Sequence, residues 1–217
     1  MTLFETARFT TSVATLSELN DAPLAMLPEL AFVGRSNAGK SSVINTLANR
    51  RQLAYASKTP GRTQLLNFFE LSRRDSDGAS VACAYAVDLP GYGFAKVDAT
   101  KRESWDELAG GYLATRRFLV GVVVVMDARR PLVPADEALL GWLARRPDGG
   151  RLRVHLLLNK SDQLTRAERA AALRLAEQRV ATLPLNASAQ IFSARTREGL
   201  ELLQETLDKI VDEARPG

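Results

Sequence analysis

One short segment has the residue types and spacing to hold the phosphates of a nucleotide. It matches the pattern G-x-x-x-x-G-K-S with Gly34, Arg35, Ser36, Asn37, Ala38, Gly39, Lys40 and Ser41, followed by Ser42. Glycines let the backbone turn so that successive N–H groups point at phosphate oxygens, and the following helix adds partial positive charge. Lys40 can reach the outer phosphates, and Ser41 can ligate Mg²⁺. The segment predicts a nucleoside triphosphate of unspecified base; the alternative is a glycine-rich turn that only starts a helix.

Two further segments could read the terminal phosphate. The pattern D-x-x-G is given by Asp88, Leu89, Pro90 and Gly91. We expect Asp88 to hold Mg²⁺ through water and the Gly91 N–H to bond the γ-phosphate. An earlier loop offers Thr63 as another Mg²⁺ ligand, within the run Gly61, Arg62, Thr63, Gln64 and Leu65. The residues expected to act in the reaction are Asn37, Lys40, Thr63 and Gly91, although D-x-x-G alone also suits a surface turn.

A third pattern, N-K-x-D, predicts the base. It consists of Asn159, Lys160, Ser161 and Asp162. The carboxylate of Asp162 only accepts hydrogen bonds, and guanine offers N1–H and its exocyclic amine side by side. Asn159 can tie this loop to the phosphate loop, and the Lys160 stem can pack along the base. Backbone N–H groups of a later strand end, Phe192, Ser193 and Ala194, could bond the guanine O6. Alone, N-K-x-D would also suit a polar turn.

The residue after D-x-x-G predicts slow hydrolysis of the bound nucleotide. Many GTPases have glutamine there to orient the attacking water, whereas this chain has Tyr92. Tyrosine is a poor substitute, so we expect unassisted hydrolysis on the order of 10⁻³ s⁻¹ or less. Asn37 resembles in position the asparagine that ligates K⁺ in potassium-activated GTPases, and a K⁺ there could neutralise charge. The alternative is that Asn37 only shapes the loop.

The elements that must position these residues alternate between strand-like and helix-like patterns. Buried strands are expected at 30–34, 64–71, 81–88, 118–127, 152–158 and 189–193, and helices at 39–49, 100–117, 134–146, 165–180 and from 200 onward. A polar connector at 72–80 predicts a hairpin, so one strand should be antiparallel. We expect an α/β fold with a mostly parallel six-stranded sheet and helices on both faces. Residues 1–28 are expected to be an extension packed on a domain of residues 29–213, as a short helix or edge strand.

Composition narrows the class of protein. The chain has 217 residues, one cysteine and one histidine, and a net charge of +4. The single Cys83 excludes an internal disulfide and is expected in the core, and His155 is expected to be structural. No apolar run is long enough to cross a bilayer and the start lacks a signal-peptide pattern, so we expect a cytoplasmic protein without membrane contact.

The motifs together resemble the EngB (YihA/YsxC) family of bacterial GTPases. The resemblance rests on the runs 34–42, 57–64 and 88–95, with Trp105, Trp142 and the Asp127-Ala128-Arg129 strand end in matching places, and covers residues 8–211. The family has Thr more often where Asn159 stands, and often Ser where Ala194 stands. The resemblance implies a Ras-like P-loop GTPase fold, GTP and Mg²⁺ binding, slow hydrolysis, a role in large ribosomal subunit assembly, and a link to cell division and septation.

The expected partner is therefore the large ribosomal subunit or its precursor, through ribosomal RNA and proteins, bound by a monomer. Basic residues that could meet RNA phosphates are Arg50, Arg51, Lys58, Arg62, Arg73 and Arg74. For any one of them a solvated surface charge is the simpler interpretation. Two other functions stay open: a small-molecule kinase or ATPase, and a non-hydrolysing, nucleotide-gated RNA- or ribosome-binding module.

Overall fold

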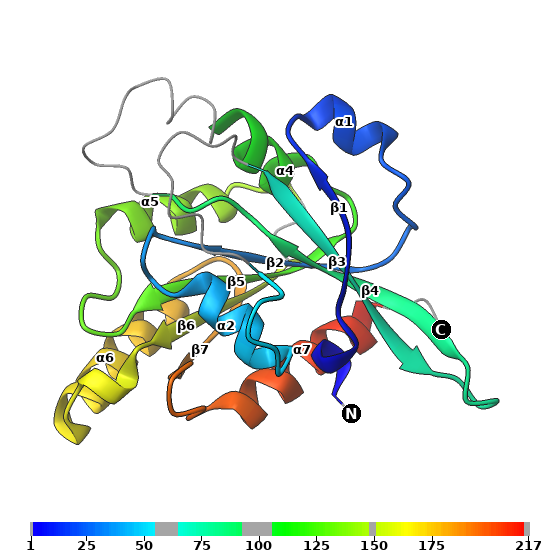
Figure 1. Ribbon diagram of the computed structural model, residues 1–217. Helices are drawn as coiled ribbons and strands as arrows, with labels where there is room; N and C mark the ends of the chain where they lie inside the picture. Colours follow the sequence, from blue (N-terminus) through cyan, green and yellow to red (C-terminus); the bar gives the residue numbers. More distant parts are fainter. Residues whose placement is uncertain (1, 55–64, 93–105, 148–150, 215–217) are drawn as a thin grey trace.

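Figure 1 shows the computed structural model, which describes residues 2–54, 65–92, 106–147 and 151–214. The strands form one seven-stranded sheet in the order β1-β3-β4-β2-β5-β6-β7. They are β1 (Arg8–Val13), β2 (Glu29–Gly34), β3 (Leu66–Arg74), β4 (Ser80–Asp88), β5 (Leu119–Asp127), β6 (Arg153–Asn159) and β7 (Asn186–Ile191). The helices and helical turns are η1 (Leu3–Thr6), α1 (Leu16–Asp21), α2 (Lys40–Leu47), η2 (Asp106–Gly110), α4 (Gly111–Thr115), α5 (Pro134–Leu143), η3 (Ser161–Gln163), α6 (Arg166–Ala181) and α7 (Leu200–Ala214).

The strand directions confirm the expected mixed sheet. Strand β2 pairs in parallel with β4 and β5, and β6 pairs in parallel with β5 and β7. Strand β3 is antiparallel to both β4 and β1, so it alone runs against the others. The sheet has seven strands instead of six because β1 joins as an edge strand. Only the last residue of its sequence, Arg-Phe-Thr-Thr-Ser-Val, is buried, so the strand carries little apolar signal.

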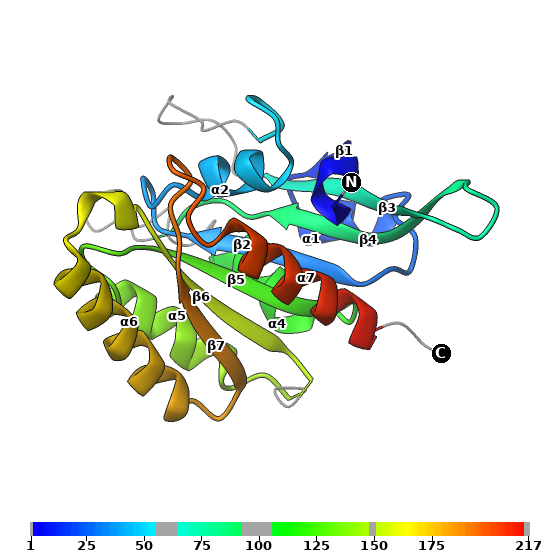
Figure 2. The same cartoon turned by 90° about the horizontal axis from the view of Figure 1, so that it is seen from below.

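Apolar side chains cover both faces of the sheet. One core cluster joins the sheet to side chains of α1, α4, α5 and α6, and the other joins it to η1, α2 and α7. Figure 2 shows α7 lying along one face of the central strands. Strand β2 lies between these layers with all six residues buried. Cys83 is a buried core residue, as expected.

The hairpin between β3 and β4 is tighter than the predicted connector of residues 72–80. Residues up to Arg74 continue β3, and Ser80 already starts β4. The turn is held by Asp75, whose Oδ1 accepts hydrogen bonds from the N–H groups of Asp77 and Ala79. An Asp side chain that bonds the backbone two residues ahead favours such turns, so the polar composition marked the turn but not its length.

The C-terminal half follows the predicted pattern closely. Thr165 and Glu168 form the expected capping box at the start of α6, with mutual hydrogen bonds. The predicted apolar face of α7, which consists of Leu200, Leu203, Leu207 and Ile210, is buried. The last strand lies at 186–191 instead of 189–193. Its first residues are polar, and they join the sheet by pairing with β6, where Ser188 stands opposite His155.

Candidate nucleotide-binding site

The predicted motifs meet at one edge of the sheet. The carboxyl ends of β2, β4, β5, β6 and β7 lead into the segments that start at residues 34, 88, 127, 159 and 192. Adjacent parallel strands place their ends together, and in α/β sheets ligands bind at this edge. Leu65 lies at the same edge, just before β3, because Asn67 pairs with Asp88. Gly61, Arg62, Thr63 and Gln64, like Lys58 and Trp105, lie outside the described residues.

Glycines of the phosphate loop stand where a side chain would collide with the fold. A Cβ on Gly34 would lie 2.6 Å from the Val125 carbonyl oxygen, and one on Gly39 would lie 2.3 Å from the Asn159 side-chain nitrogen. Gly39 also has a φ of 96° at the start of α2. Asn37 has a φ of 66°, in the left-handed region where asparagine is among the better tolerated residues. This backbone conformation gives a reason for asparagine at position 37 that is independent of any ion.

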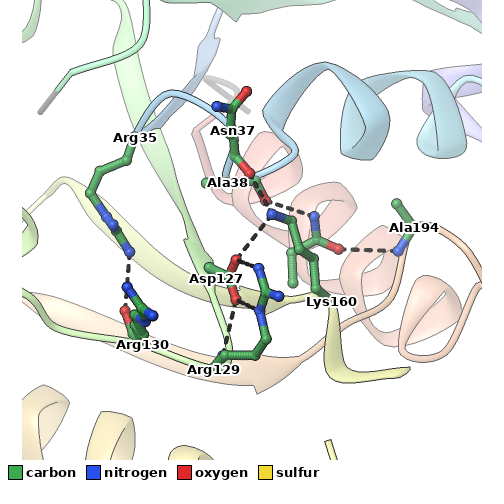
Figure 3. Close-up of polar contacts among 9 residues, drawn as sticks. Arg35, Asn37, Ala38, Asp127, Arg129, Arg130, Lys160 and Ala194 are labelled. Carbon is green, nitrogen blue, oxygen red and sulfur yellow. Dashed lines mark hydrogen bonds and ion pairs between the residues drawn. The ribbon is translucent and has the colours of Figure 1, made fainter. Parts of the chain in front are cut away.

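Asn159 joins three segments of this edge through Ala38 and Ala194, which are both labelled in Figure 3. Its side-chain N–H₂ donates to the Ala38 carbonyl at 2.9 Å, and its side-chain oxygen accepts from the Ala194 N–H at 3.1 Å. The residue is only 2% exposed. The prediction that Asn159 ties the N-K-x-D loop to the phosphate loop is confirmed. Loss of this side chain would free both loops at once.

Lys160 is held over the phosphate loop by the carboxylate of Asp127, which belongs to none of the three nucleotide-binding patterns. Its ammonium group donates to the Asn37 carbonyl and lies 3.0 Å from Asp127 Oδ2. Asp127 also accepts two hydrogen bonds from the Arg129 guanidinium, at 2.9 and 2.6 Å, and one from the Arg129 N–H at 3.1 Å. Partial burial opposes ionisation of Asp127, but the hydrogen bonds from Arg129 and Lys160 outweigh it and lower its pKa below the usual range. An ionised Asp127 therefore fixes the direction of the Lys160 stem.

Asp162 presents a buried oxygen suited to a ligand. Its Oδ1 accepts from the Ser193 hydroxyl at 2.7 Å. Its Oδ2 is buried and, within the part of the chain that the structure describes, has no hydrogen-bond partner. An Arg195 guanidinium nitrogen lies 3.6 Å from this oxygen and makes an ion pair but no hydrogen bond. Buried polar atoms are normally hydrogen-bonded, so this oxygen fits the paired N–H donors of guanine.

The loop that carries Asp162 is itself braced. The Ser161 hydroxyl donates to Glu198 Oε2 at 2.7 Å, and Arg169 Nη1 lies 3.0 Å from Glu198 Oε1. The Ser193 N–H donates to the Glu198 carbonyl. Glu198 lies six residues beyond Phe192 and has no place in the predicted motifs. Contacts formed only in the folded chain therefore orient the Asp162 carboxylate.

Lys40 and Asp88 face each other across the site. The Lys40 ammonium group contacts Asp88 Oδ1 in an ion pair, and both side chains are largely buried. Among the residues described, no three or more His, Cys, Asp or Glu side chains cluster as a metal site would need. Mg²⁺ in nucleotide sites is bound by one or two protein ligands and the phosphates. The hard oxygens of Ser41 and Asp88 suit that ion.

Tyr92 is turned into the protein. Its side chain is 6% exposed in the core, and its hydroxyl donates to Asp136 Oδ1 at 2.7 Å. This agrees with the expectation that Tyr92 does not replace a water-orienting glutamine. Asp136 itself is completely buried in the first turn of α5. In the sequence Val-Pro-Ala-Asp this residue is typical of a helix start, and nothing in that pattern indicates its contact with Tyr92.

The basic residues predicted to meet RNA divide into distinct groups. Arg73 is paired with Asp208 and Asp212 of α7, so this side chain braces the fold. Arg74 donates to the Gly78 carbonyl in the hairpin turn at 2.8 Å. Arg50 and Arg51 are exposed just after α2.

None of the described helices is long and apolar enough to cross a membrane.

The sequence is similar to those of known proteins. A family model described as 50S ribosome-binding GTPase matches residues 29–160. A probable GTP-binding protein EngB from Paraburkholderia phytofirmans is 43% identical over 211 residues, covering 95% of this chain and 92% of that protein. One from Laribacter hongkongensis is 47% identical, covering 94% and 85%.

Solved structures share the fold at low sequence identity. A GTP-binding protein from Sulfolobus solfataricus in complex with GDP has a TM-score of 0.60 at 17% identity, covering 92% of this chain and 56% of that one. The crystal structure of a probable GTP-binding protein engB has a TM-score of 0.56 at 17% identity, covering 85% and 99%. These likenesses show the fold alone.

Proposed function

Because the chain belongs to the EngB family of GTP-binding proteins and is a GTPase, we propose that it acts as a GTP-controlled switch in assembly of the large ribosomal subunit. The description of the matching family model, a 50S ribosome-binding GTPase, supports this partner. Membership of a GTPase family argues against the two other functions considered, a kinase or ATPase and a non-hydrolysing module. The proposal includes the link to cell division and septation that the family resemblance implies, with the protein acting in the cytoplasm as a monomer.

The observation that carries the switch is the direct bonding between the segment after β4 and the phosphate loop. The Tyr92 N–H donates to the Gly34 carbonyl at 3.2 Å, and the Ser36 N–H donates to the Tyr92 carbonyl at 3.3 Å. Lys40 of the phosphate loop also contacts Asp88. A terminal phosphate bound by Lys40 competes with this ion pair, so its presence alters both segments together.

Ions complete the proposed site. Ser41 and Asp88, with Thr63, would hold Mg²⁺, which when bound neutralises charge on the phosphates. Lys40 would orient the outer phosphates and the Gly91 N–H would bond the terminal one.

K⁺ at Asn37 is a further proposal. Its test compares turnover in K⁺ and Na⁺ for the wild type and Asn37→Ala; equal wild-type rates in both salts, with and without ribosomal particles, rule it out.

Base recognition would come from Asp162, whose buried Oδ2 fits the guanine donors. Adenine presents an acceptor at N1, which would face the carboxylate. Leaving such polar groups unpaired can discriminate by about 10⁴–10⁵. A titration of GTP against ATP measures this preference directly.

Cosedimentation tests the ribosomal role. Purified protein is mixed with large-subunit particles in the presence of a non-hydrolysable GTP analogue, GDP or no nucleotide. We expect the analogue-bound protein to sediment with the particles and the GDP-bound protein to stay in the supernatant. The Asp162→Ala variant, which lacks the base-reading carboxylate, should not respond to the analogue at the same concentration. Equal sedimentation with GDP and with the analogue would rule out the switch.

A further inference from the structure

A buried carboxylate outside the predicted motifs joins the two segments that surround the phosphates. Asp136 has a completely buried side chain in the first turn of α5. Its Oδ1 accepts from the Tyr92 hydroxyl at 2.7 Å and from Arg35 Nε at 3.1 Å. Its Oδ2 accepts from the Val133 N–H at 3.2 Å. One carboxylate therefore contacts the residue after D-x-x-G, the phosphate loop and its own helix start.

The Tyr92 side of this cluster determines where Gly91 lies. Tyr92 forms a parallel bridge with Arg35, with backbone hydrogen bonds on both sides. Gly91 is packed so closely that a Cβ there would lie 3.2 Å from the Ser36 hydroxyl oxygen and 3.4 Å from the Gly34 carbonyl oxygen. The Gly91 N–H is thus held beside the phosphate loop by the anchored residue that follows it.

The Arg35 side holds the phosphate loop itself. Besides Asp136, Arg35 donates to the Arg130 carbonyl at 3.1 Å (Figure 3). Its guanidinium therefore bridges the segment after β5 and the start of α5. Its side chain is 23% exposed, and Asp136 behind it is fully buried. Arg35 occupies one of the variable positions of the phosphate-loop pattern. Its direction toward Asp136 shows that this position is used for anchoring.

We propose that Asp136 is a positioning residue for GTP hydrolysis, which acts through Tyr92 and Arg35 to set the Gly91 N–H against the phosphate loop. The chemistry that it serves is recognition of the terminal phosphate by Gly91. GDP lacks that phosphate, so the effect of the cluster is specific to GTP. A tyrosine that cannot orient water thus gains a role as an anchor. The proposal rests on GTP hydrolysis by this chain and is independent of the ribosomal role.

The Tyr92 hydroxyl does not lose its proton in the ordinary pH range. Burial, together with the neighbouring charge of Asp136, raises the pKa of the Tyr92 hydroxyl well above its usual range. The hydroxyl therefore stays protonated and remains a donor wherever the protein is folded. A hydrogen bond to a charged acceptor in a buried site is stronger than one between neutral groups.

The chain contains a matched control for this cluster. Tyr112, also completely buried, donates its hydroxyl to Glu29 Oε2 at 2.8 Å, and Arg116 donates to the same carboxylate. The residue types are the same in kind: a tyrosine, a buried carboxylate and an arginine. Glu29 begins β2, however, whereas the phosphate loop follows its other end. Tyr112→Phe removes the same kind of hydrogen bond far from the nucleotide.

The test compares Tyr92→Phe with Tyr112→Phe, because removing the Asp136 carboxylate outright would also destabilise the fold. Purified variants are assayed for single-turnover GTP hydrolysis and for affinity toward GDP and a non-hydrolysable GTP analogue. We expect Tyr92→Phe to lower the hydrolysis rate and the analogue affinity by roughly 5- to 30-fold and to leave GDP affinity within about twofold. We expect Tyr112→Phe to leave all three within about twofold.

Two outcomes would overturn the proposal. One is equal behaviour of the two variants in hydrolysis and in the ratio of analogue to GDP affinity. The other is an equal loss of GDP and analogue affinity in Tyr92→Phe, which indicates a general loosening of the site. Nucleotide binding by purified protein does not depend on ribosomal particles, so neither result bears on the cosedimentation experiment.

Discussion

The two ends of β2 carry clusters of the same chemical kind with different surroundings. At the amino end, Glu29 is bound by Tyr112 and Arg116. Beyond the carboxyl end, Asp136 is bound by Tyr92 and Arg35. The first cluster joins the central strand β2 to α4 and the residue after it. The second joins the phosphate loop to the segment that follows D-x-x-G. Similar contacts thus stabilise the fold at one end and are proposed to couple it to nucleotide at the other.

The comparison shows that the role of a buried polar cluster depends on which segments of the chain its residues connect. A buried ion pair is weak evidence for stability by itself, because desolvation opposes the attraction. Removing one partner is nevertheless costly, since the other charge is left buried. The comparison can therefore be tested by removing partners at each end and measuring stability and nucleotide affinity separately.

The largest expected effect is on stability at the amino end. Glu29→Ala leaves the Arg116 guanidinium and the Tyr112 hydroxyl without their carboxylate, and we expect a loss of about 3–5 kcal/mol in the free energy of unfolding. Urea denaturation measures this value. GTP affinity of the folded fraction should be unchanged. A loss below about 1 kcal/mol would mean that the cluster does not stabilise the amino end.

Acid should destabilise the fold by a comparable amount through a buried histidine of β6, the strand next to the edge strand β7. Burial lowers the pKa of His155 to about 4, against an opposing hydrogen bond with Gln190. The unfolded chain, with a histidine pKa near 6.5, takes up a proton between about pH 6.5 and 4 that the folded chain does not. Stability should therefore fall by about 3 kcal/mol as the pH drops through that range.

Urea denaturation of the wild type and His155→Gln at pH 7 and 4.5 measures this contribution. The variant should be less sensitive to acid, because the titrating ring is gone. Identical pH dependence of the two proteins would show that His155 does not titrate as its burial indicates. The His155→Gln substitution should leave GTP affinity unchanged, since His155 lies in β6 away from either end of β2.

At the carboxyl end, Asp162→Ala should separate affinity from stability. The change removes the acceptor for two guanine donors, and we expect GTP affinity to fall about a hundredfold or more, as the loss of hydrogen bonds to a charged group implies. Isothermal titration calorimetry measures the affinity, and the unfolding free energy should change by less than about 1 kcal/mol. An unaltered preference of the variant for GTP over ATP would exclude Asp162 as the base reader.

A smaller effect is expected from Asp127→Asn, which weakens the support of Lys160. A partly exposed ion pair contributes about 1 kcal/mol or less, so GTP affinity should fall up to about fivefold. Arg129→Ala is the control, because Arg129 contacts the same carboxylate from a side chain that is 47% exposed. Equal losses of GTP affinity in the two variants would indicate that the Asp127–Arg129 contact, and not the Asp127–Lys160 contact, supports nucleotide binding.

The site could be predicted from sequence where a motif requires particular residues at fixed spacing. Asn159 was predicted to tie two loops and does so through Ala38. Asp136, Asp127 and Glu198 were assigned no role because each is brought to the site by tertiary packing. Asp136 lies 101 residues beyond Arg35, and its position resembles a helix cap. Local pattern cannot reveal a partner that distant.

The fold shows the same division. Continuous apolar runs predicted β2 and β5, and the capping box predicted the start of α6. Strand β1 carries polar residues on an edge, so only its pairing with β3 makes it a strand. The hairpin turn was placed correctly but was predicted too long, because polar residues at Ser72 and Arg73 continue a strand whose end projects beyond the core.

Amide hydrogen exchange in the GDP and GTP-analogue complexes tests most directly whether only one end of β2 is coupled to nucleotide. The account predicts greater protection of residues 88–92 with the analogue than with GDP, and equal protection of residues 112–116 in both complexes. In Tyr92→Phe the difference at residues 88–92 should shrink, and in Tyr112→Phe it should persist. Equal protection of residues 88–92 in the two complexes, or a change of the same size at both ends, would contradict the account.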